Sequence, residues 1–395
     1  MLLTPSTELE TRIARVQERL RRDHFDGALI VGNAHLFYLA GTIQQGHLLL
    51  PAEGEPLLLV RRDLGRARAE SALPTIEPLP GFRELPAALA RLGLHRGVRL
   101  GLELDLLPVN HYRRFATMLP EVEFHDCAPL LRQVRSVKSA FEIDRQREAA
   151  VQTDLALQAG AAVVREGVPE NVVAAEIIGS LFRNGHQGLL RFRAFNQEMF
   201  FAHCFAGPDA GVASYLDVPM AGRGLTPAVA QGAGTRPIGR GEPIVVDVGG
   251  AVDGYGVDQT RTLSLGPLPE RFADGYRACR EILDHMQVAA VPGVVTGDLY
   301  EEALEMAAAA GLADVFMGAA PSQVSFIGHG IGLEIDELPV LARGAQAVLE
   351  EGQVMAIEPK LVFPGEGAVG IEDTFRVGAA GLEPLTFSDR DVWEL

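Results

Sequence analysis

Short apolar runs alternate with amphipathic segments along the first third of the chain. Residues 8–22 predict an amphipathic helix, because four apolar residues recur there at helical spacing: Leu9, Ile13, Val16 and Leu20. The runs GALIVG (27–32) and PLLLV (56–60) predict short buried strands, and we interpret the segment NAHLFYLAGT (33–42) between them as a loop. The alternation continues to about Pro129, which predicts a compact α/β unit with a three-layer character.

The remainder of the chain combines helical patterns with glycine-rich apolar runs that predict strands. A charged stretch, RQVRSVKS (132–139), precedes a long helical pattern that reaches residue 164, and we place a domain boundary between residues 134 and 135. Further helices are predicted at 167–185, 269–289 and 297–311. The expected organisation is therefore a domain at 1–134 followed by a second domain at 135–395.

Composition excludes several classes of protein. The 395 residues suffice for two cores, and the formal charge of −17 argues against a nucleic-acid surface, which needs clustered Lys and Arg. No apolar run approaches the ~20 residues of a membrane helix, and the first 20 residues mix acids and arginines where a signal peptide would be basic and then apolar. The three cysteines, Cys127, Cys204 and Cys279, lie far apart, so we expect reduced core thiols in a cytoplasmic protein.

Two aspartates interrupt apolar strand patterns in EPIVVDVGGAVDGYGVDQTRTLSLG (242–266). The glycine-rich turn between the two apolar runs predicts a hairpin, with Asp247 on one strand and Asp258 on the return strand. A carboxylate inside an apolar strand is costly to bury unless a positive charge neutralises it. Two carboxylates on adjacent strands would repel each other, and a divalent cation would remove that repulsion.

The same pattern recurs further along the chain. Glu358 ends the apolar run of GQVMAIEPKLVF, Glu372 lies in GIEDTFRV, and His329 lies between glycines in GHGIGLEIDELP. One such residue alone is usually a turn, cap or structural residue, but all five together make coincidence improbable. Four carboxylates and one imidazole form a hard ligand set that suits Mn²⁺, Co²⁺, Fe²⁺ or Zn²⁺, and their charge favours two divalent ions. We expect Mn²⁺, with Co²⁺, Zn²⁺ and Fe²⁺ as alternatives.

These motifs resemble those of the pita-bread metallopeptidases, the family of prolidase, aminopeptidase P and methionine aminopeptidase. The resemblance is carried by DVGGAVDGYGVDQTRT, GHGIGLEIDELP, GQVMAIEP and GIEDTFRV, in the family's order. NAHLFYLAGT and RSVKSAFEID extend it to the amino-terminal domain and the linker. The resemblance implies an α/β (α+β) fold, with a creatinase/prolidase-like domain at 1–134 and a pita-bread catalytic domain at 135–395.

The resemblance also implies a role for each of the five residues. Asp247 would bind one ion, His329 and Glu358 would bind the other, and Asp258 and Glu372 would bridge the two. A hydroxide bridging the ions would be the nucleophile, and Glu358 would also shuttle the proton. The implied enzyme is a homodimeric Xaa-Pro dipeptidase of the prolidase type, in which the amino-terminal domain restricts the length of the peptide substrate.

Two histidines of the family's active site have no counterpart here. Asp336 stands seven residues after His329, where the family has an imidazole that contacts the substrate. The second position is taken by Gln231 or, in an alignment without the apparent insertion at 212–228, by Ser214. Because they stand at the positions of these two histidines, Gln231 and Asp336 are candidate catalytic residues. Gln231 can donate a neutral hydrogen bond.

The departures leave several alternatives open. Asp336 could form an ion pair with Arg193 or Arg261, or with a positively charged part of the substrate. The insertion could be a lid whose Tyr215 or Met220 shapes the pocket, or a surface loop. The alternative function is a hydrolase or lyase of the same fold that acts on a small zwitterionic metabolite. A binding protein without turnover is a third class, against which the complete ligand set counts.

Overall fold

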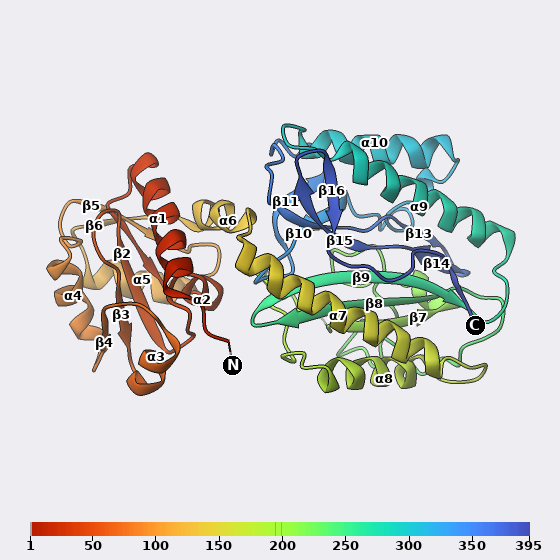
Figure 1. Ribbon diagram of the computed structural model, residues 1–395, viewed down its shortest axis with the longest axis horizontal. Coiled ribbons are helices and arrows are strands. Elements are labelled where there is room, and N and C mark those ends of the chain that lie inside the picture. Colours follow the sequence, from red (N-terminus) through yellow and green to blue (C-terminus); the bar gives the residue numbers. More distant parts are fainter. Residues whose placement is uncertain (1, 194, 199) are drawn as a thin grey trace. The chain divides into compact units, whose positions relative to one another are not determined.

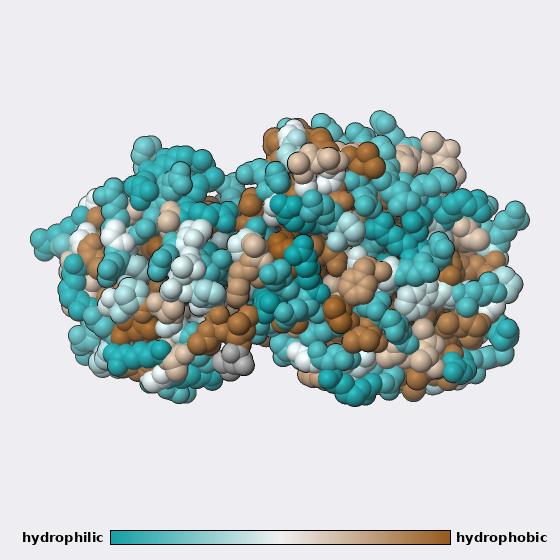
Figure 2. Space-filling model, viewed as in Figure 1, coloured by the Kyte–Doolittle hydropathy of each residue, from teal (hydrophilic) through white to brown (hydrophobic). Residues whose placement is uncertain are grey.

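The computed structural model describes residues 2–193, 195–198 and 200–395. Its internal contacts divide the chain into two compact units, Met1–Arg135 and Ser136–Leu395. The face drawn in Figure 2 is largely hydrophilic, with apolar residues in small scattered groups. Among the described residues, no helix is both long and apolar enough to cross a membrane.

The first unit is a six-stranded mixed sheet with helices around it. The strand order is β4-β3-β2-β1-β5-β6. Its strands are β1 (Gly27–Ile30), β2 (Gly46–Pro51), β3 (Leu57–Val60), β4 (Ile76–Pro78), β5 (Val98–Leu102) and β6 (Val122–Asp126). Its helices are α1 (Ser6–Arg22), α2 (Asn33–Ala40), α3 (Leu64–Glu70), α4 (Leu85–Arg91), α5 (Val109–Met118) and α6 (Ala128–Ser136), with a 3-10 turn at Phe82–Glu84. The last residue of α6, Ser136, already belongs to the second unit. The amphipathic helix and both strands predicted in this region are confirmed.

The expected loop at 33–42 is wrong, because the structure has helix α2 there. Two features stabilise the helix. At its start, the buried carboxylate of Glu103 accepts hydrogen bonds from the backbone N–H groups of Val31 and Gly32, at 2.8 and 2.7 Å. At its end, Gly41 adopts a left-handed conformation with φ of 69°, which caps helices well. Since Glu103 lies 71 residues beyond Gly32 in the chain, no local pattern could reveal these hydrogen bonds.

The second unit contains three sheets and the longer helices. A four-stranded sheet has the order β17-β9-β8-β7, a five-stranded sheet the order β11-β10-β12-β15-β16, and β13 pairs with β14. The strands are β7 (Ala202–Ala206), β8 (Ile244–Val252), β9 (Tyr255–Ser264), β10 (Phe326–Gly330), β11 (Glu337–Ala342), β12 (Val354–Ile357), β13 (Lys360–Phe363), β14 (Gly367–Gly370), β15 (Asp373–Gly378), β16 (Gly381–Pro384) and β17 (Trp393–Glu394).

Helices cover these sheets in two pairs (Figure 1). The helices are α7 (Ala140–Val163), α8 (Glu170–Arg183), α9 (Glu270–Ala289) and α10 (Thr296–Ala309), with 3-10 turns at Gly207–Gly211 and Ala313–Val315. The α7 helix packs on β8 and β9 and α8 on β7, whereas α9 packs on β14 and β16 and α10 on β11. All four helices predicted from the sequence in this unit are confirmed. The sheets between the two helix pairs hold the acidic residues singled out above.

Candidate metal centre

The two aspartates lie on the predicted hairpin of β8 and β9. The turn consists of Asp253 and Gly254, both with positive φ (47° and 94°), as a two-residue type I′ turn requires. Asp247 is paired across the ladder with Thr260, and Asp258 is paired with Gly249. Because paired residues point to the same side of a sheet and side chains alternate along a strand, both aspartates lie on one face, diagonally rather than directly opposite.

The other three expected residues come from the five-stranded sheet and its edges. His329 lies on β10 and is paired with Ala356 on β12. Glu358 directly follows β12, and Glu372 directly precedes β15. An isolated bridge between Thr260 and Glu372 joins the hairpin to this second sheet. The tertiary structure therefore brings side chains from residues 247 to 372 close together, although they are far apart in the sequence.

Asp258, His329 and Glu372 form a group that fits a metal ion. Each offers one ligand atom, and the three atoms all lie within 4.8 Å of one another. Two carboxylates and an imidazole are ligands that Mn²⁺, Fe²⁺, Co²⁺ and Zn²⁺ accept. Glu358 lies next to this group, since its Oε1 is 3.6 Å from Nε2 of His329. The donor set therefore fits one divalent ion on the His329 side.

Lys360 is a residue of this site that the sequence reasoning missed. Its ammonium nitrogen lies 2.8 Å from Oε2 of Glu358, 3.0 Å from Oε2 of Glu372 and 3.2 Å from Oδ2 of Asp247. The side chain is only 4% exposed. The signal in the sequence was a lysine inside the apolar run KLVF, which is as improbable in a buried strand as the acids were. A cation of the protein itself thus lies among three of the five expected ligands.

Burial and crowded charge shift the pKa values of the site. Burial, together with Glu372 and Asp247, raises the pKa of Asp258 well above its ordinary range. Burial also raises the pKa of Glu372 to about 7, although Lys360 opposes that shift. Burial alone would raise the pKa of Asp247 too, but Lys360 and then His203 outweigh it and hold that pKa low. The charged form is therefore most disfavoured at Asp258 and Glu372, where a divalent cation would relieve the repulsion between carboxylates.

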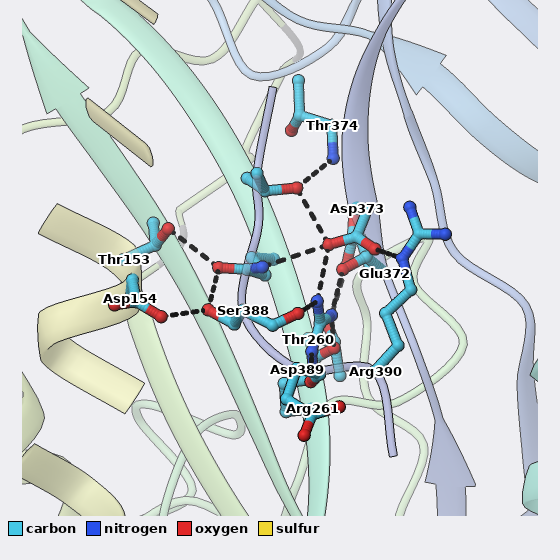
Figure 3. A network of polar contacts seen from close by, with 12 residues as sticks. Thr153, Asp154, Thr260, Arg261, Glu372, Asp373, Thr374, Ser388, Asp389 and Arg390 are labelled. Atoms are coloured by element: carbon cyan, nitrogen blue, oxygen red, sulfur yellow. Dashed lines mark hydrogen bonds and ion pairs between the residues drawn. The ribbon is translucent and has the colours of Figure 1, made fainter. Parts of the chain in front are cut away.

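A network of polar contacts fixes Glu372 in place (Figure 3). The hydroxyl of Thr260 donates to Oε2 of Glu372 at 2.8 Å. The next residue, Asp373, is fully buried and accepts from Arg261 at 2.8 Å and from Arg390 at 2.6 Å. Arg261 also donates to the backbone oxygen of Glu372 at 2.8 Å. Both arginines therefore neutralise Asp373 and leave the carboxylate of Glu372 to the metal side.

Asp336 lies beside the ligand group and remains open to solvent. Its Oδ1 is 3.6 Å from Nδ1 of His329, and its side chain is 54% exposed. Arg193 pairs with Glu334 and Arg261 with Asp373, so neither of the arginine pairs considered for Asp336 is found among the described residues. Burial alone would lower the pKa of His329, but Asp336, Glu358 and Glu372 raise it.

Gln231 is buried and engaged within the chain. Its amide nitrogen donates to the backbone oxygen of Glu198 and to the hydroxyl of Tyr215, the latter at 3.1 Å. Ser214 accepts a hydrogen bond from the backbone of Leu216 at 3.1 Å. The segment 212–228 contains no regular helix or strand, Tyr215 is exposed, and Met220 is buried in a core cluster with Phe205 and Val245.

His203 is a second residue that the sequence reasoning missed. It lies on β7, buried, and is paired across the ladder with Asp247. Its ring stacks on Phe205 at 5.2 Å between centroids, and burial lowers its pKa below the ordinary value. A buried imidazole is therefore present next to Asp247, although nothing in the local sequence AHCFA distinguishes it from a core histidine.

Comparisons with known proteins agree with this architecture. The model of metallopeptidase family M24 matches residues 144–379, and that of the creatinase/prolidase N-terminal domain matches residues 12–137. The chain is 27% identical to the Xaa-Pro dipeptidase of Pyrococcus horikoshii, over 97% of this chain and 99% of that protein. The crystal structure of the prolidase from Pyrococcus horikoshii OT3 is similar, with a TM-score of 0.81 and 25% identity over 97% of this chain and 99% of the other.

A second solved structure gives the same result. Dipeptidase PepE from Mycobacterium ulcerans superimposes with a TM-score of 0.80 at 26% identity, covering 99% of each chain. Since these similarities extend over both units, the order of the two domains is shared as well as the fold of each.

Proposed function

The chain belongs to metallopeptidase family M24, and from that premise we propose that it hydrolyses the bond before proline in Xaa-Pro dipeptides. The observation that carries the proposal is the group formed by Asp258, His329 and Glu372, which fits a divalent ion. Relatives named Xaa-Pro dipeptidase, matched over nearly the whole chain, support this choice of substrate.

The expected ligand set is Asp247, Asp258, His329, Glu358 and Glu372, and Mn²⁺ is the ion that we propose. When bound, the metal would act as a Lewis acid that activates water and polarises the scissile carbonyl. The number of ions that the site accepts depends on Lys360, which lies among three of the five residues.

Glu358 is the residue that we propose to move the proton. Its side chain is buried, with Oε1 directed to His329 and Oε2 held 2.8 Å from the ammonium of Lys360. This contact fixes the carboxylate in one orientation at the edge of the ligand group. Glu358 would accept a proton from the attacking water and deliver it to the leaving proline nitrogen.

Asp336 is proposed to bind the amino end of the substrate. Its carboxylate is exposed, has no arginine partner within the described part of the chain, and lies 3.6 Å from His329. An exposed carboxylate at that place suits the α-ammonium group of a dipeptide. Gln231 directs its amide hydrogens to Glu198 and Tyr215, so we assign it a positioning role through Tyr215 instead of a direct contact with substrate.

We also propose the remaining expectations from the sequence. Residues 1–134 would form the domain that restricts substrate length, and 135–395 the catalytic domain. The enzyme would be a cytoplasmic homodimer. All three cysteines are buried and free, which supports a reducing compartment.

Asp336 also favours one alternative activity. A hydrolase or lyase that acts on a small zwitterionic metabolite would use an exposed carboxylate to bind the cationic end of its substrate. This reading keeps the metal site and changes only the substrate.

The experiment is a substrate panel with the Mn²⁺-loaded protein. Xaa-Pro dipeptides, Xaa-Pro-Xaa tripeptides and small zwitterionic amides are compared, each with the wild type and with Glu358→Ala. Turnover of the dipeptides that is lost in Glu358→Ala is expected. Turnover of the amides alone would replace the peptidase by the alternative, and no turnover of any compound with metal bound would refute both.

A further inference from the structure

Glu358 and Glu372 each divide their two carboxylate oxygens between His329 and Lys360. Oε1 of Glu358 is 3.6 Å from Nε2 of His329, and Oε2 is 2.8 Å from Nζ of Lys360. Oε1 of Glu372 is 4.0 Å from the same imidazole nitrogen, and Oε2 is 3.0 Å from the same ammonium. Bridging carboxylates divide their oxygens in this way between two cations. Here one of the two cationic positions is filled by a side chain.

The five expected ligands thus separate into two overlapping groups. Asp258, His329 and Glu372 are close enough together to hold an ion. Asp247, Glu358 and Glu372 surround the ammonium of Lys360 instead, at 2.8 to 3.2 Å. Asp247, which the sequence suggested as a ligand of a separate ion, is therefore already neutralised by a charge of the chain.

The fold makes room for the lysine in this position. Lys360 begins β13 and is paired across the ladder with Gly370 on β14. A Cβ atom at residue 370 would lie 2.5 Å from Cγ of Lys360, closer than two non-bonded carbon atoms can approach. Only glycine at 370 leaves space for the aliphatic stem, so the strand pair holds the ammonium among the carboxylates.

The choice of basic residue agrees with this role. Among 35 basic residues the chain has only two lysines, Lys138 and Lys360, and all others are arginines. Both lysines are buried, and Lys138 pairs with Glu337 at 2.9 Å. An ammonium is a compact point charge, whereas a guanidinium is a planar fork that needs more space. The position of a metal ion between three carboxylates suits the ammonium.

A second divalent ion would compete directly with Lys360. Bound through Asp247 and the two glutamates, it would use the oxygens that the ammonium already contacts and would lie next to a like charge. We propose that Lys360 takes the place of the second metal ion, so that this site binds a single divalent ion through Asp258, His329 and Glu372. The inference rests on the proposed function only in taking the site to be a metal centre.

The test is the metal stoichiometry of the full chain, measured by elemental analysis and by calorimetric titration with Mn²⁺. The wild type is expected to bind one equivalent, and Lys360→Gln, which removes the charge, is expected to bind two. Lys138→Gln is the matched control, because it changes the only other buried lysine, and one equivalent is expected. Two equivalents in the wild type would overturn the proposal.

Further variants separate this role from a structural one. Asp247→Asn is expected to keep one equivalent of Mn²⁺, since Asp247 faces the ammonium, whereas His329→Ala should bind none; loss of the ion in Asp247→Asn would contradict the proposal. Lys360→Gly is a second variant, needed if Lys360→Gln folds poorly. Circular dichroism in the presence of Mn²⁺ shows whether each variant is folded. If folded Lys360→Gln and Lys360→Gly both bind one ion, Lys360 does not exclude the second and the proposal fails.

The stoichiometry is independent of peptide hydrolysis. One bound ion without turnover of Xaa-Pro dipeptides would refute the proposed substrate and leave the role of Lys360 intact. A wild type that binds no divalent ion would refute the metal centre and this inference together.

Discussion

The ammonium of Lys360 lies 2.8 Å from Oε2 of Glu358, two residues earlier in the chain. Both side chains are buried, so each neutralises the other where water is largely excluded. The contact also leaves the second oxygen of Glu358 directed to His329. One buried ion pair thus orients the carboxylate that we propose to move the proton.

Replacement of that carboxylate should separate binding from turnover. In Glu358→Gln the side chain keeps its size but cannot accept a proton, and kcat on Xaa-Pro dipeptides is expected to fall by about 10²- to 10⁴-fold. Steady-state kinetics with Mn²⁺ present measures the change. Unaltered kcat in the variant would rule out Glu358 as the proton shuttle.

Removal of the metal should destabilise the second unit. A ligand at 1,000 times its Kd stabilises the folded state by about 4 kcal/mol. The thermal unfolding temperature of the wild type is therefore expected to drop when a chelator removes Mn²⁺. His329→Ala is the control, since it lacks one ligand and should unfold at the same temperature with and without Mn²⁺.

Asp336 should strengthen the metal ligand beside it. Nδ1 of His329 is hydrogen-bonded to the backbone oxygen of Gly330 at 3.1 Å, and the carboxylate of Asp336, 3.6 Å from the same nitrogen, adds its charge. Loss of a partner of a metal ligand typically weakens metal binding by about 10- to 100-fold, and a partner that acts through charge alone belongs at the lower end of that range. Asp336→Asn is expected to raise the Kd for Mn²⁺ within that range in a calorimetric titration. An unchanged Kd together with a raised KM for dipeptides would assign Asp336 to the substrate alone.

Loss of Arg261, the central arginine of the buried network behind Glu372, should lower the free energy of unfolding. Arg261→Met leaves Asp373 with Arg390 as its remaining cationic partner and removes the hydrogen bond to the backbone of Glu372. Removal of one partner from a buried ion pair costs about 3–5 kcal/mol. Urea unfolding followed by tryptophan fluorescence, with Trp393 as the single tryptophan, would show the shift. A loss below about 1 kcal/mol would mean that Arg390 suffices.

Glu103 gives the first unit a dependence on acid pH. Burial would raise its pKa, but His35 and the backbone N–H groups of Gly32 and Val31 lower it from 4.5 to about 2. A depressed carboxyl pKa stabilises the fold fully above the unfolded value. The contribution, about 3 kcal/mol, is lost as the pH falls from about 4.5 towards 2.

Glu103→Gln should accordingly destabilise the protein at pH 7 and matter little near pH 2. Urea unfolding of wild type and variant at both pH values, followed by far-ultraviolet circular dichroism, provides the comparison. A difference in unfolding free energy that is the same at both pH values would contradict the assigned pKa.

Local pattern was sufficient for much of the fold. The hairpin of Asp247 and Asp258 was predictable because two apolar runs and the glycine-rich turn between them lie within 21 residues. The long helix α7 was predicted from its own segment of the sequence, after the charged stretch that precedes it. Helix α2 was missed because the backbone just before it is held by Glu103, a residue distant in sequence.

The sequence by itself determined which residues are unusually costly, in free energy, to bury. An acid in a buried strand needs a compensating charge wherever it lies, so Asp247, Asp258, Glu358 and Glu372 were recognisable as a set, although not one at a time. Only the tertiary structure decided what compensates each of them. Whether an ammonium group or a metal ion neutralises a carboxylate depends on distances of about 3 Å between side-chain atoms from strands far apart in the chain. Those distances place Lys360, and not a second open position, beside Asp247.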